Sequence, residues 1–228
     1  MTAEHLKFRK DAPIALTDLW TKANAAFTNE TKLRVAPRET RIFRASGTRE
    51  LSQGLYLSEQ TGSVNPAVDG VIRPQADPTI FRSSAAWSGT KGPGERPMYA
   101  GWGGARADST PYGQTLRIAG VTYAAGIGIL ANSRLEVRNQ GYRRLNAKVG
   151  VDDSAHDRTR SVTFMVYGDG KLLAKSKPMR WGQPAHALNA DVAGVKLIEL
   201  VARSTGGENE HLPVSWGDAA LSSPVQPD

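Results

Sequence analysis

The sequence of 228 residues contains no cysteine, so it can form neither a disulfide bond nor a thiolate metal site. It also lacks an apolar run long enough to span a membrane, and we predict no membrane span. Its first residues, MTAEHLKFRKD, lack the apolar region of a signal peptide. These features leave open a cytoplasmic protein and a piece cut from a longer chain.

Recognisable catalytic motifs are absent as well. There is no GxSxG elbow, no Walker A sequence and no strand–GxGxxG–helix unit, and the four histidines are scattered without metal-ligand spacing. Glycoside hydrolysis needs two carboxylates that flank one bond. Asp152 and Asp153 are adjacent and should diverge on an extended chain, so either would need a distant partner such as Glu210 or Asp218. The sequence therefore predicts no active site within these residues.

Positively charged residues outnumber negatively charged ones, which gives a net charge of +7 and a pI of about 9.8. Such a balance permits binding to nucleic acid or to an anionic surface. However, the lysines and arginines are dispersed among aspartates and glutamates, and the densest cluster, RNQGYRR at 138–144, is short. We interpret this cluster as a solvated sheet face and predict no nucleic-acid partner.

Helical periodicity is nearly absent, whereas period-two alternation is widespread. In SVTFMVYGDGKLLAKS, alternate residues from Val162 to Val166 should face inward, and Gly168-Asp169-Gly170 should form a hairpin turn. RLNAKVGV at 144–151 alternates in the same way. VKLIELVARS at 195–204 is apolar on both faces, as in a central strand. The pattern predicts an all-β protein with an antiparallel β-sandwich.

The chain divides into two parts, which we place at residues 1–47 and 48–225. The first part contains two or three predicted strands and is too short to hold a core alone. It must therefore pack on the following domain, on another copy, or on a domain outside this chain. Between residues 58 and 111 Gly, Pro, Ser and Asp dominate, and loops of this length are usually functional or mobile.

Three polar loops combine aromatic or imidazole rings with carboxylates: MYAGWGGARAD, GVDDSAHDR and GGENEHLPVSWGD. Sugar recognition uses a flat ring against C–H groups together with polar side chains that bond hydroxyls. We expect Trp102 to stack on a sugar and Trp216 to lie in the core. The predicted carbohydrate-binding residues are Trp102, Asp152, His156, Arg158, Glu210 and His211.

The loop GVDDSAHDR has two further interpretations. Asp152, Asp153 and Asp157 are oxygen ligands on one short loop, which Ca²⁺ could use, although their spacing does not match an EF-hand. Alternatively, the three carboxylates bond local backbone N–H groups and only brace a polar turn. We favour the second interpretation, in which the carboxylates stabilise a polar turn.

Several stretches, in order, resemble the NPCBM family of carbohydrate-binding modules: YLSE, GWG, LRIAGVTYAAGIGILANS, YRRLNAKVGVDD, SVTFMVYGDGKLL, DVAGVKLIELVA and SWGDAAL. The resemblance covers about residues 50 to 222. It implies a jelly-roll β-sandwich of galactose-binding-like type that is appended to glycoside hydrolases and binds galactose-containing glycans. It also implies a secreted or periplasmic location and, in some members, a structural Ca²⁺ ion.

The first part of the chain is similar to the end of the antiparallel β domain that follows the catalytic barrel in alpha-galactosidase-like enzymes. This similarity rests on the stretches DLW at 18–20 and VAPRETRIFR at 35–44. With the barrel absent, the expected role is a non-catalytic accessory part whose partners are a glycan and a catalytic glycosidase domain or chain. The alternatives are a structural β domain that has lost sugar binding and a subunit of an active alpha-galactosidase-like enzyme.

Two departures from the family pattern favour loss of sugar binding. Leu130 stands where the family has a histidine, and Arg134 stands where it has an acidic residue. The run before the final strand, EHLPVSWGD, also has extra residues ahead of Trp216. If the missing histidine contacts sugar in the family, sugar binding by this chain should be altered or lost.

Overall fold

The computed structural model describes residues 1–59, 105–205 and 212–223. The chain forms two compact units, Met1–Ser52 (unit 1) and Gln53–Asp228 (unit 2). Three predicted site residues, Trp102, Glu210 and His211, lie outside the described residues. In the described part of the chain, no helix is long and apolar enough to cross a membrane.

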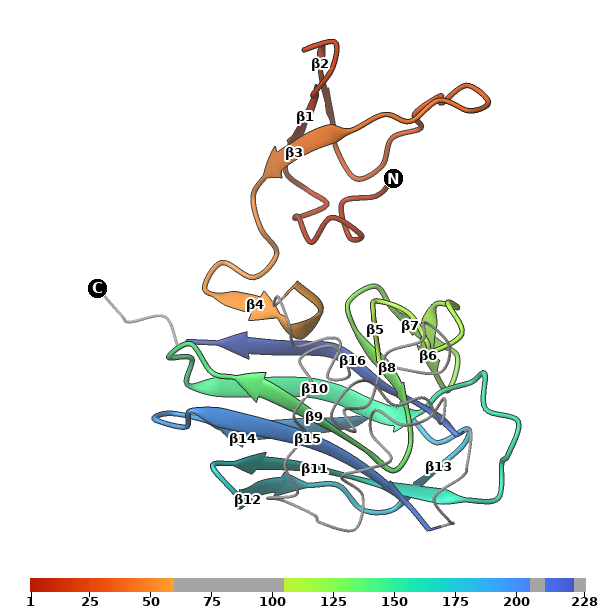
Figure 1. Cartoon of the computed structure of the whole chain (residues 1–228), viewed down its shortest axis with the longest axis vertical. Helices are drawn as coiled ribbons and strands as arrows, with labels where there is room; N and C mark the ends of the chain where they lie inside the picture. Colours follow the sequence, from red (N-terminus) through yellow and green to blue (C-terminus); the bar gives the residue numbers. More distant parts are fainter. Residues whose placement is uncertain (60–104, 206–211, 224–228) are drawn as a thin grey trace, which may run out of the picture. The chain divides into compact units, whose positions relative to one another are not determined.

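Unit 1 is a small antiparallel sheet in the order β2-β1-β3, formed by Asn24–Phe27, Ile14–Asp18 and Phe43–Gly47 (Figure 1). Strand β1 alternates buried and less buried residues, as expected when one face is covered. The fully buried apolar residues described in this unit are Ala3, Ile14 and Leu16. Its core is therefore very small for its length.

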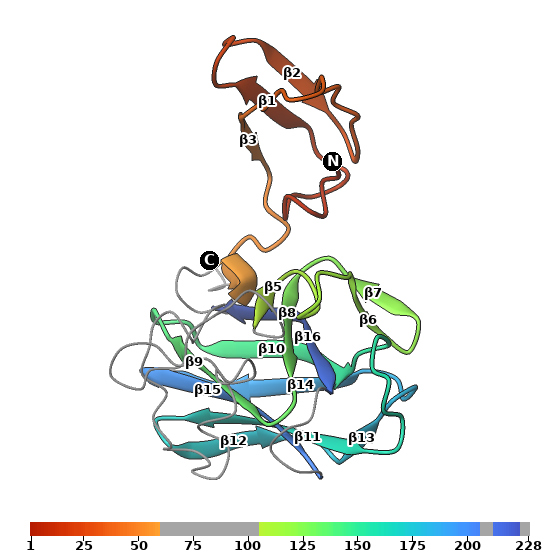
Figure 2. The ribbon, with the colours of Figure 1, turned by 45° about the vertical axis from the view of Figure 1, so that its right-hand side comes forward.

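Unit 2 is an antiparallel β-sandwich, which confirms the predicted fold class (Figure 2). Its first sheet has the order β14-β10-β16-β8-β5, with β4 also paired to β16. These strands are β14 His186–Asp191, β10 Arg144–Val151, β16 Pro213–Ser222, β8 Gly126–Leu130, β5 Arg106–Ala107 and β4 Gly54–Tyr56, the last followed by the 3-10 turn η1 Leu57–Glu59.

The second sheet has the order β12-β11-β15-β9, and β13 also pairs with β11. These strands are β12 Lys171–Lys175, β11 Ser161–Gly168, β15 Leu197–Ser204, β9 Ser133–Arg138 and β13 Met179–Arg180. Strand β15 lies between two partners, as its doubly apolar sequence predicts. The predicted hairpin turn is also present, because Asp169 and Gly170 between β11 and β12 both have positive φ.

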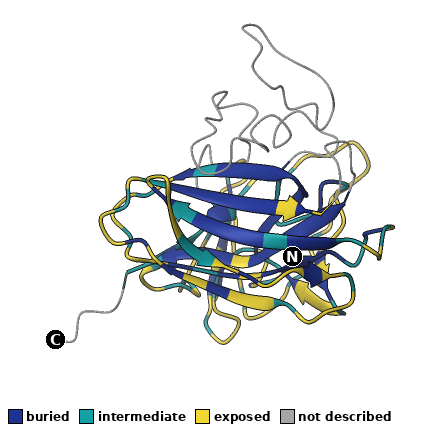
Figure 3. Cartoon of the chain, turned by 90° about the horizontal axis from the view of Figure 1, so that it is seen from below, coloured by how far each residue is buried: buried dark blue, intermediate teal, exposed yellow. Residues whose placement is uncertain are grey.

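The core lies between the two sheets and consists of the inward-facing members of the alternating patterns. Val162, Phe164 and Val166 face it from β11, as predicted. Trp216 is 1% exposed and meets Phe164 edge to face, with ring centroids 5.3 Å apart. Figure 3 shows this division, with buried residues along the central strands and exposed residues in the connections and on edge strands such as β12 and β14.

A hairpin of β6 (Leu116–Ile118) and β7 (Val121–Tyr123) lies on the outer face of the first sheet. The sheet has glycines beneath it: a Cβ atom on Gly150 would lie 2.6 Å from Ile118 Cγ2, and one on Gly217 would lie 2.5 Å from Tyr123 Cγ. Only residues without side chains leave room for so close an approach. This packing fixes the hairpin beside the end of β10.

Candidate functional site

One end of the sandwich gathers the loops on which several predicted site residues occur. Strand β8 ends and β16 begins there, with Leu130 paired to Pro213, and β10 ends there, with Val151 paired to Val214. We define the loop end as the β6–β7 hairpin with the residues before it (114–123), the loop after β10 (152–160) and the turn after β13 (181–185). Hydrogen bonds and a ring contact join these three segments to one another.

Asp152 lies at the centre of the loop end and is 1% exposed. Its Oδ2 accepts hydrogen bonds from the Arg117 backbone N–H at 2.9 Å and from the Ser215 hydroxyl at 2.7 Å. Its Oδ1 accepts the backbone N–H and the hydroxyl of Ser154 at 2.9 and 2.7 Å. These four donors occupy the acceptor positions of a carboxylate, so Asp152 ties the loop to β16 and the hairpin.

Asp153 holds the tip of the β6–β7 hairpin. Its carboxylate accepts the backbone N–H groups of Ala119 and Gly120, each at 2.8 Å, and forms an ion pair with Arg117 Nε at 3.0 Å. Ala119 and Gly120 both have positive φ, as in a type I′ turn. Asp152 and Asp153 do not diverge as predicted, because β10 ends at Val151 and both carboxylates then bond the same hairpin, Asp152 at β6 and Asp153 at the turn that follows it.

The next residues of the loop are more exposed. Asp157 accepts the backbone N–H and the hydroxyl of Thr159, both at 2.8 Å, and pairs with Arg160 Nε at 2.6 Å. The Thr159 hydrogen bonds, and more weakly the Arg160 charge, hold the pKa of Asp157 below its usual value. His156 is exposed in the same loop.

The predicted carboxylates do not form a metal-ligand set. Within the residues that the structure describes, no group of three or more His, Asp and Glu side chains could hold a metal ion. Asp152, Asp153 and Asp157 are each bonded to local N–H and O–H donors or to an arginine. The described geometry therefore has the form of a braced polar loop.

Arg158 lies over the ring of Trp181, with its Cζ 3.9 Å from the ring centroid. The Trp181 indole N–H donates to the Asp153 carbonyl at 3.3 Å, and its ring packs against the core. Sequence reasoning included Arg158 but missed Trp181. The available signal was a tryptophan followed by glycine in the polar stretch RWGQP, the same kind of context that drew attention to Trp102.

A hollow of about 360 Å³ opens beside this network. Hydroxyl, carboxamide and guanidinium side chains line it together with the Asp152 carboxylate. The hydroxyl and carboxamide groups can donate and accept hydrogen bonds with a polyhydroxylated ligand, and the guanidinium can donate them. Its volume is at the small end of the roughly 300–1,000 Å³ of ligand pockets. The lining residues are Gln114, Thr115, Arg117, Thr122, Asp152 and Ser154.

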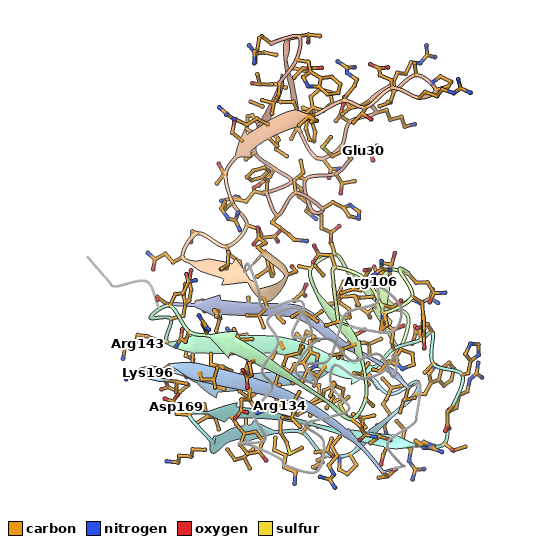
Figure 4. The ribbon with its side chains drawn as sticks, in the orientation of Figure 1. Glu30, Arg106, Arg134, Arg143, Asp169 and Lys196 are labelled. Atoms are coloured by element: carbon orange, nitrogen blue, oxygen red, sulfur yellow. The ribbon has the colours of Figure 1, made fainter. Side chains whose placement is uncertain are left out.

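Leu130 and Arg134 have different surroundings. Leu130 is 5% exposed at the end of β8 and faces away from the core, since its neighbours Ile129 and Ala131 face into it. Arg134 is fully buried on β9 and pairs with the fully buried Glu199 of β15 and with Glu136 at 3.2 Å (Figure 4). The positive charge of Arg134 is therefore paired with carboxylates of the second sheet.

In a comparison with known protein families, residues 93–222 match the NPCBM/NEW2 domain. The chain is also 29% identical over 178 residues to a Renibacterium salmoninarum protein named "Putative endo-alpha-N-acetylgalactosaminidase". That similarity takes in 75% of this chain but only 11% of the relative, so the chain spans about a tenth of that protein.

Solved structures from Clostridium perfringens ZmpB have a similar fold. The CBM51-2 and INT domains in complex with GlcNAc match with a TM-score of 0.55 and 23% identity, over 83% of this chain and 35% of that one. The M60 catalytic domain with CBM51-1 and CBM51-2 matches with a TM-score of 0.54 and 23% identity, over 83% of this chain and 17% of that one. Both similarities support the β-sandwich.

Proposed function

Because the chain belongs to the NPCBM/NEW2 domain family, we propose that it is a non-catalytic carbohydrate-binding module that accompanies a glycoside hydrolase. The relative from Renibacterium salmoninarum carries a glycosidase name, which supports this association. Galactose-containing glycans are the proposed ligands, as the family resemblance implies. A single sugar should bind weakly, so the overall avidity for a glycan is raised by several binding sites or by a tethered enzyme.

The hollow at the loop end is the observation that carries this proposal. It is bordered by side chains that can bond hydroxyl groups, and it lies between two segments held together by the Asp152 and Asp153 carboxylates. Such bracing fixes the lining groups before the ligand arrives, which lowers the ordering cost of binding. Asp152 then acts as a positioning residue, while Gln114 and Thr122 remain exposed to a ligand.

Titration of the isotopically labelled chain with methyl galactoside, followed by NMR, tests the proposal. We expect shifts in the amide signals of residues 114–123 and 152–158. Gln114→Ala should lower the affinity roughly 2- to 10-fold, the loss expected for one hydrogen bond. Gln140→Ala, on the connection between β9 and β10 at the other end of the sandwich, is the matched control and should change nothing.

A structural β domain without sugar binding is the second candidate. It is favoured by the apolar Leu130 in the family's histidine position and by the complete use of the Asp152 acceptors within the fold. An absence of shifts across a panel of galactosides and N-acetylhexosamines at millimolar concentrations would decide in its favour.

For unit 1 we propose the closing strands of a glycosidase-type antiparallel β domain, whose remainder belongs to a catalytic partner. Its three-stranded sheet and its small buried core support this proposal. Co-purification of the chain with a catalytic glycosidase domain tests it, with Trp20, which is 57% exposed, as the first contact to mutate.

A further inference from the structure

The charges of the loop end are unevenly compensated. Asp153 pairs with Arg117, Asp157 pairs with Arg160, and Asp152 accepts four hydrogen bonds. Arg158 differs from these residues. Among the described residues it has neither a carboxylate within ion-pair distance nor a hydrogen-bond acceptor, although its side chain is exposed at the same loop. Within the described part of the chain, the loop end therefore presents the Arg158 guanidinium without a paired carboxylate.

Trp181 holds this guanidinium in place. Arg158 Cζ lies 3.9 Å from the centroid of the Trp181 ring, and the indole N–H donates a hydrogen bond to the Asp153 carbonyl. The arrangement has two consequences. The covered face of Trp181 is closed to the C–H groups of a sugar, and the N–H groups at the edge of the guanidinium remain available as donors. A guanidinium that rests on an aromatic ring is suited to a planar acceptor with two oxygens.

We propose that Arg158, positioned by Trp181, binds the carboxylate of an acidic sugar, so that the module selects glycans that contain a uronate. The inference rests on the proposed function, because it assumes that the loop end receives a saccharide. Among the described carboxylates of the loop end, Asp153 and Asp157 are paired with arginines, and Asp152 is buried and accepts four hydrogen bonds from neutral donors. The net charge of +7 draws anionic glycans toward the chain.

Paired ligands test the proposal. Methyl galactoside and methyl galacturonoside differ only at C6, where a hydroxymethyl group is replaced by a carboxylate. Calorimetric or NMR titration of the full chain at low salt should show a preference for the uronate of at least about tenfold, as for a charge-assisted hydrogen bond. Arg158→Gln should abolish this preference by lowering the affinity for methyl galacturonoside. Arg158→Lys should keep only part of it, since a lysine cannot bond both oxygens in a plane.

Arg144→Gln is the matched control. Arg144 is an exposed arginine at the start of β10, at the end of that strand opposite to Asp152, and its loss lowers the net charge equally. The preference for the uronate should survive this change. If it falls as much as in Arg158→Gln, the general field of the chain is responsible and the role of Arg158 is refuted.

Two further outcomes separate this inference from the proposed function. Equal affinity for the two ligands, or a uronate preference that persists in Arg158→Gln, overturns the inference and leaves the carbohydrate-binding module intact. Failure of the unaltered chain to bind either ligand or any other glycan in a panel overturns both.

Discussion

At the scale of single residues, the two aspartates after β10 act mainly within the fold. Asp152 joins β16, the β6–β7 hairpin and its own loop, and Asp153 holds the tip of that hairpin. The buried Asp152 carboxylate accepts four hydrogen bonds, and the Asp153 carboxylate accepts two backbone N–H groups and pairs with Arg117. Their neighbour Arg158 differs, because it is exposed and, among the described residues, contacts the ring of Trp181 without an ion-pair partner.

Removal of the Asp152 carboxylate should destabilise unit 2 strongly. Asp152→Ala leaves a hydroxyl and backbone N–H groups without their acceptor in a buried place, so we expect a loss of about 3 kcal/mol in the free energy of unfolding. Urea denaturation followed by circular dichroism measures it. Asp157→Ala, in the same loop but more exposed, should cost much less, and equal losses would show that burial is not the cause.

Asp18 in unit 1 provides a prediction about pH. The backbone N–H of Thr21, the Arg41 side chain and the backbone N–H of Trp20 together lower the pKa of Asp18 to about 2. Because this folded-state pKa lies below the unfolded value of about 3.9, the stabilisation is complete above about pH 4 and is lost as the pH falls toward 2.

The amide shifts of Trp20 and Thr21 should therefore titrate with a midpoint near 2, as measured by NMR between pH 5 and pH 1.5. Arg41→Gln should move the midpoint upward, because it removes one of the three stabilising groups. A midpoint near 3.9 in the unaltered chain would contradict the hydrogen-bonded arrangement.

At the scale of elements, the β6–β7 hairpin determines where the candidate site forms. Its apolar residues pack on glycines of the first sheet, and its backbone is held by the aspartates of the loop. The position of the hollow thus depends on the close approach of hairpin and sheet.

A side chain added under the hairpin should displace it. Gly150→Ala places a Cβ atom 2.6 Å from Ile118 Cγ2, so we expect a loss of about 1–3 kcal/mol in stability and weaker glycan binding. The double variant Gly150→Ala/Ile118→Ala should cost less than the sum of the two single changes, as thermal or urea unfolding would show. Strict additivity would mean that the two positions do not meet.

At the scale of the whole molecule, the two units differ in how much core they contain. The main core of unit 2 extends through both sheets, whereas the described apolar core of unit 1 is Ala3, Ile14 and Leu16. We expect residues 53–228 alone to unfold cooperatively and to keep glycan binding, and residues 1–52 alone to show no cooperative transition in circular dichroism. A sigmoidal melting curve for the short fragment would refute this expectation.

The sequence predicted what local patterns determine. Alternation placed Val162, Phe164 and Val166 in the core, and turn residues marked the hairpin at Asp169-Gly170. It could not predict contacts made by segments distant in the chain, such as Asp153 with Ala119 or Trp181 with Arg158. These contacts depend on which loops converge at one end of the sandwich. The predicted divergence of Asp152 and Asp153 was wrong because it assumed an extended chain, whereas β10 ends at Val151, directly before the pair.

The buried pair of Arg134 and Glu199 has a consequence for how the second sheet assembles. Arg134 lies on the face of β9 opposite to Leu135, and Glu199 lies on the face of β15 opposite to Leu200. A slip of β9 by one residue would turn every one of its side chains to the other face and would place a guanidinium among the core leucines and valines. Such an alternative is far more costly than a slip in an all-apolar strand. The pair therefore discriminates against mispaired forms of the sheet, a contribution that a comparison of folded and unfolded states alone would not reveal.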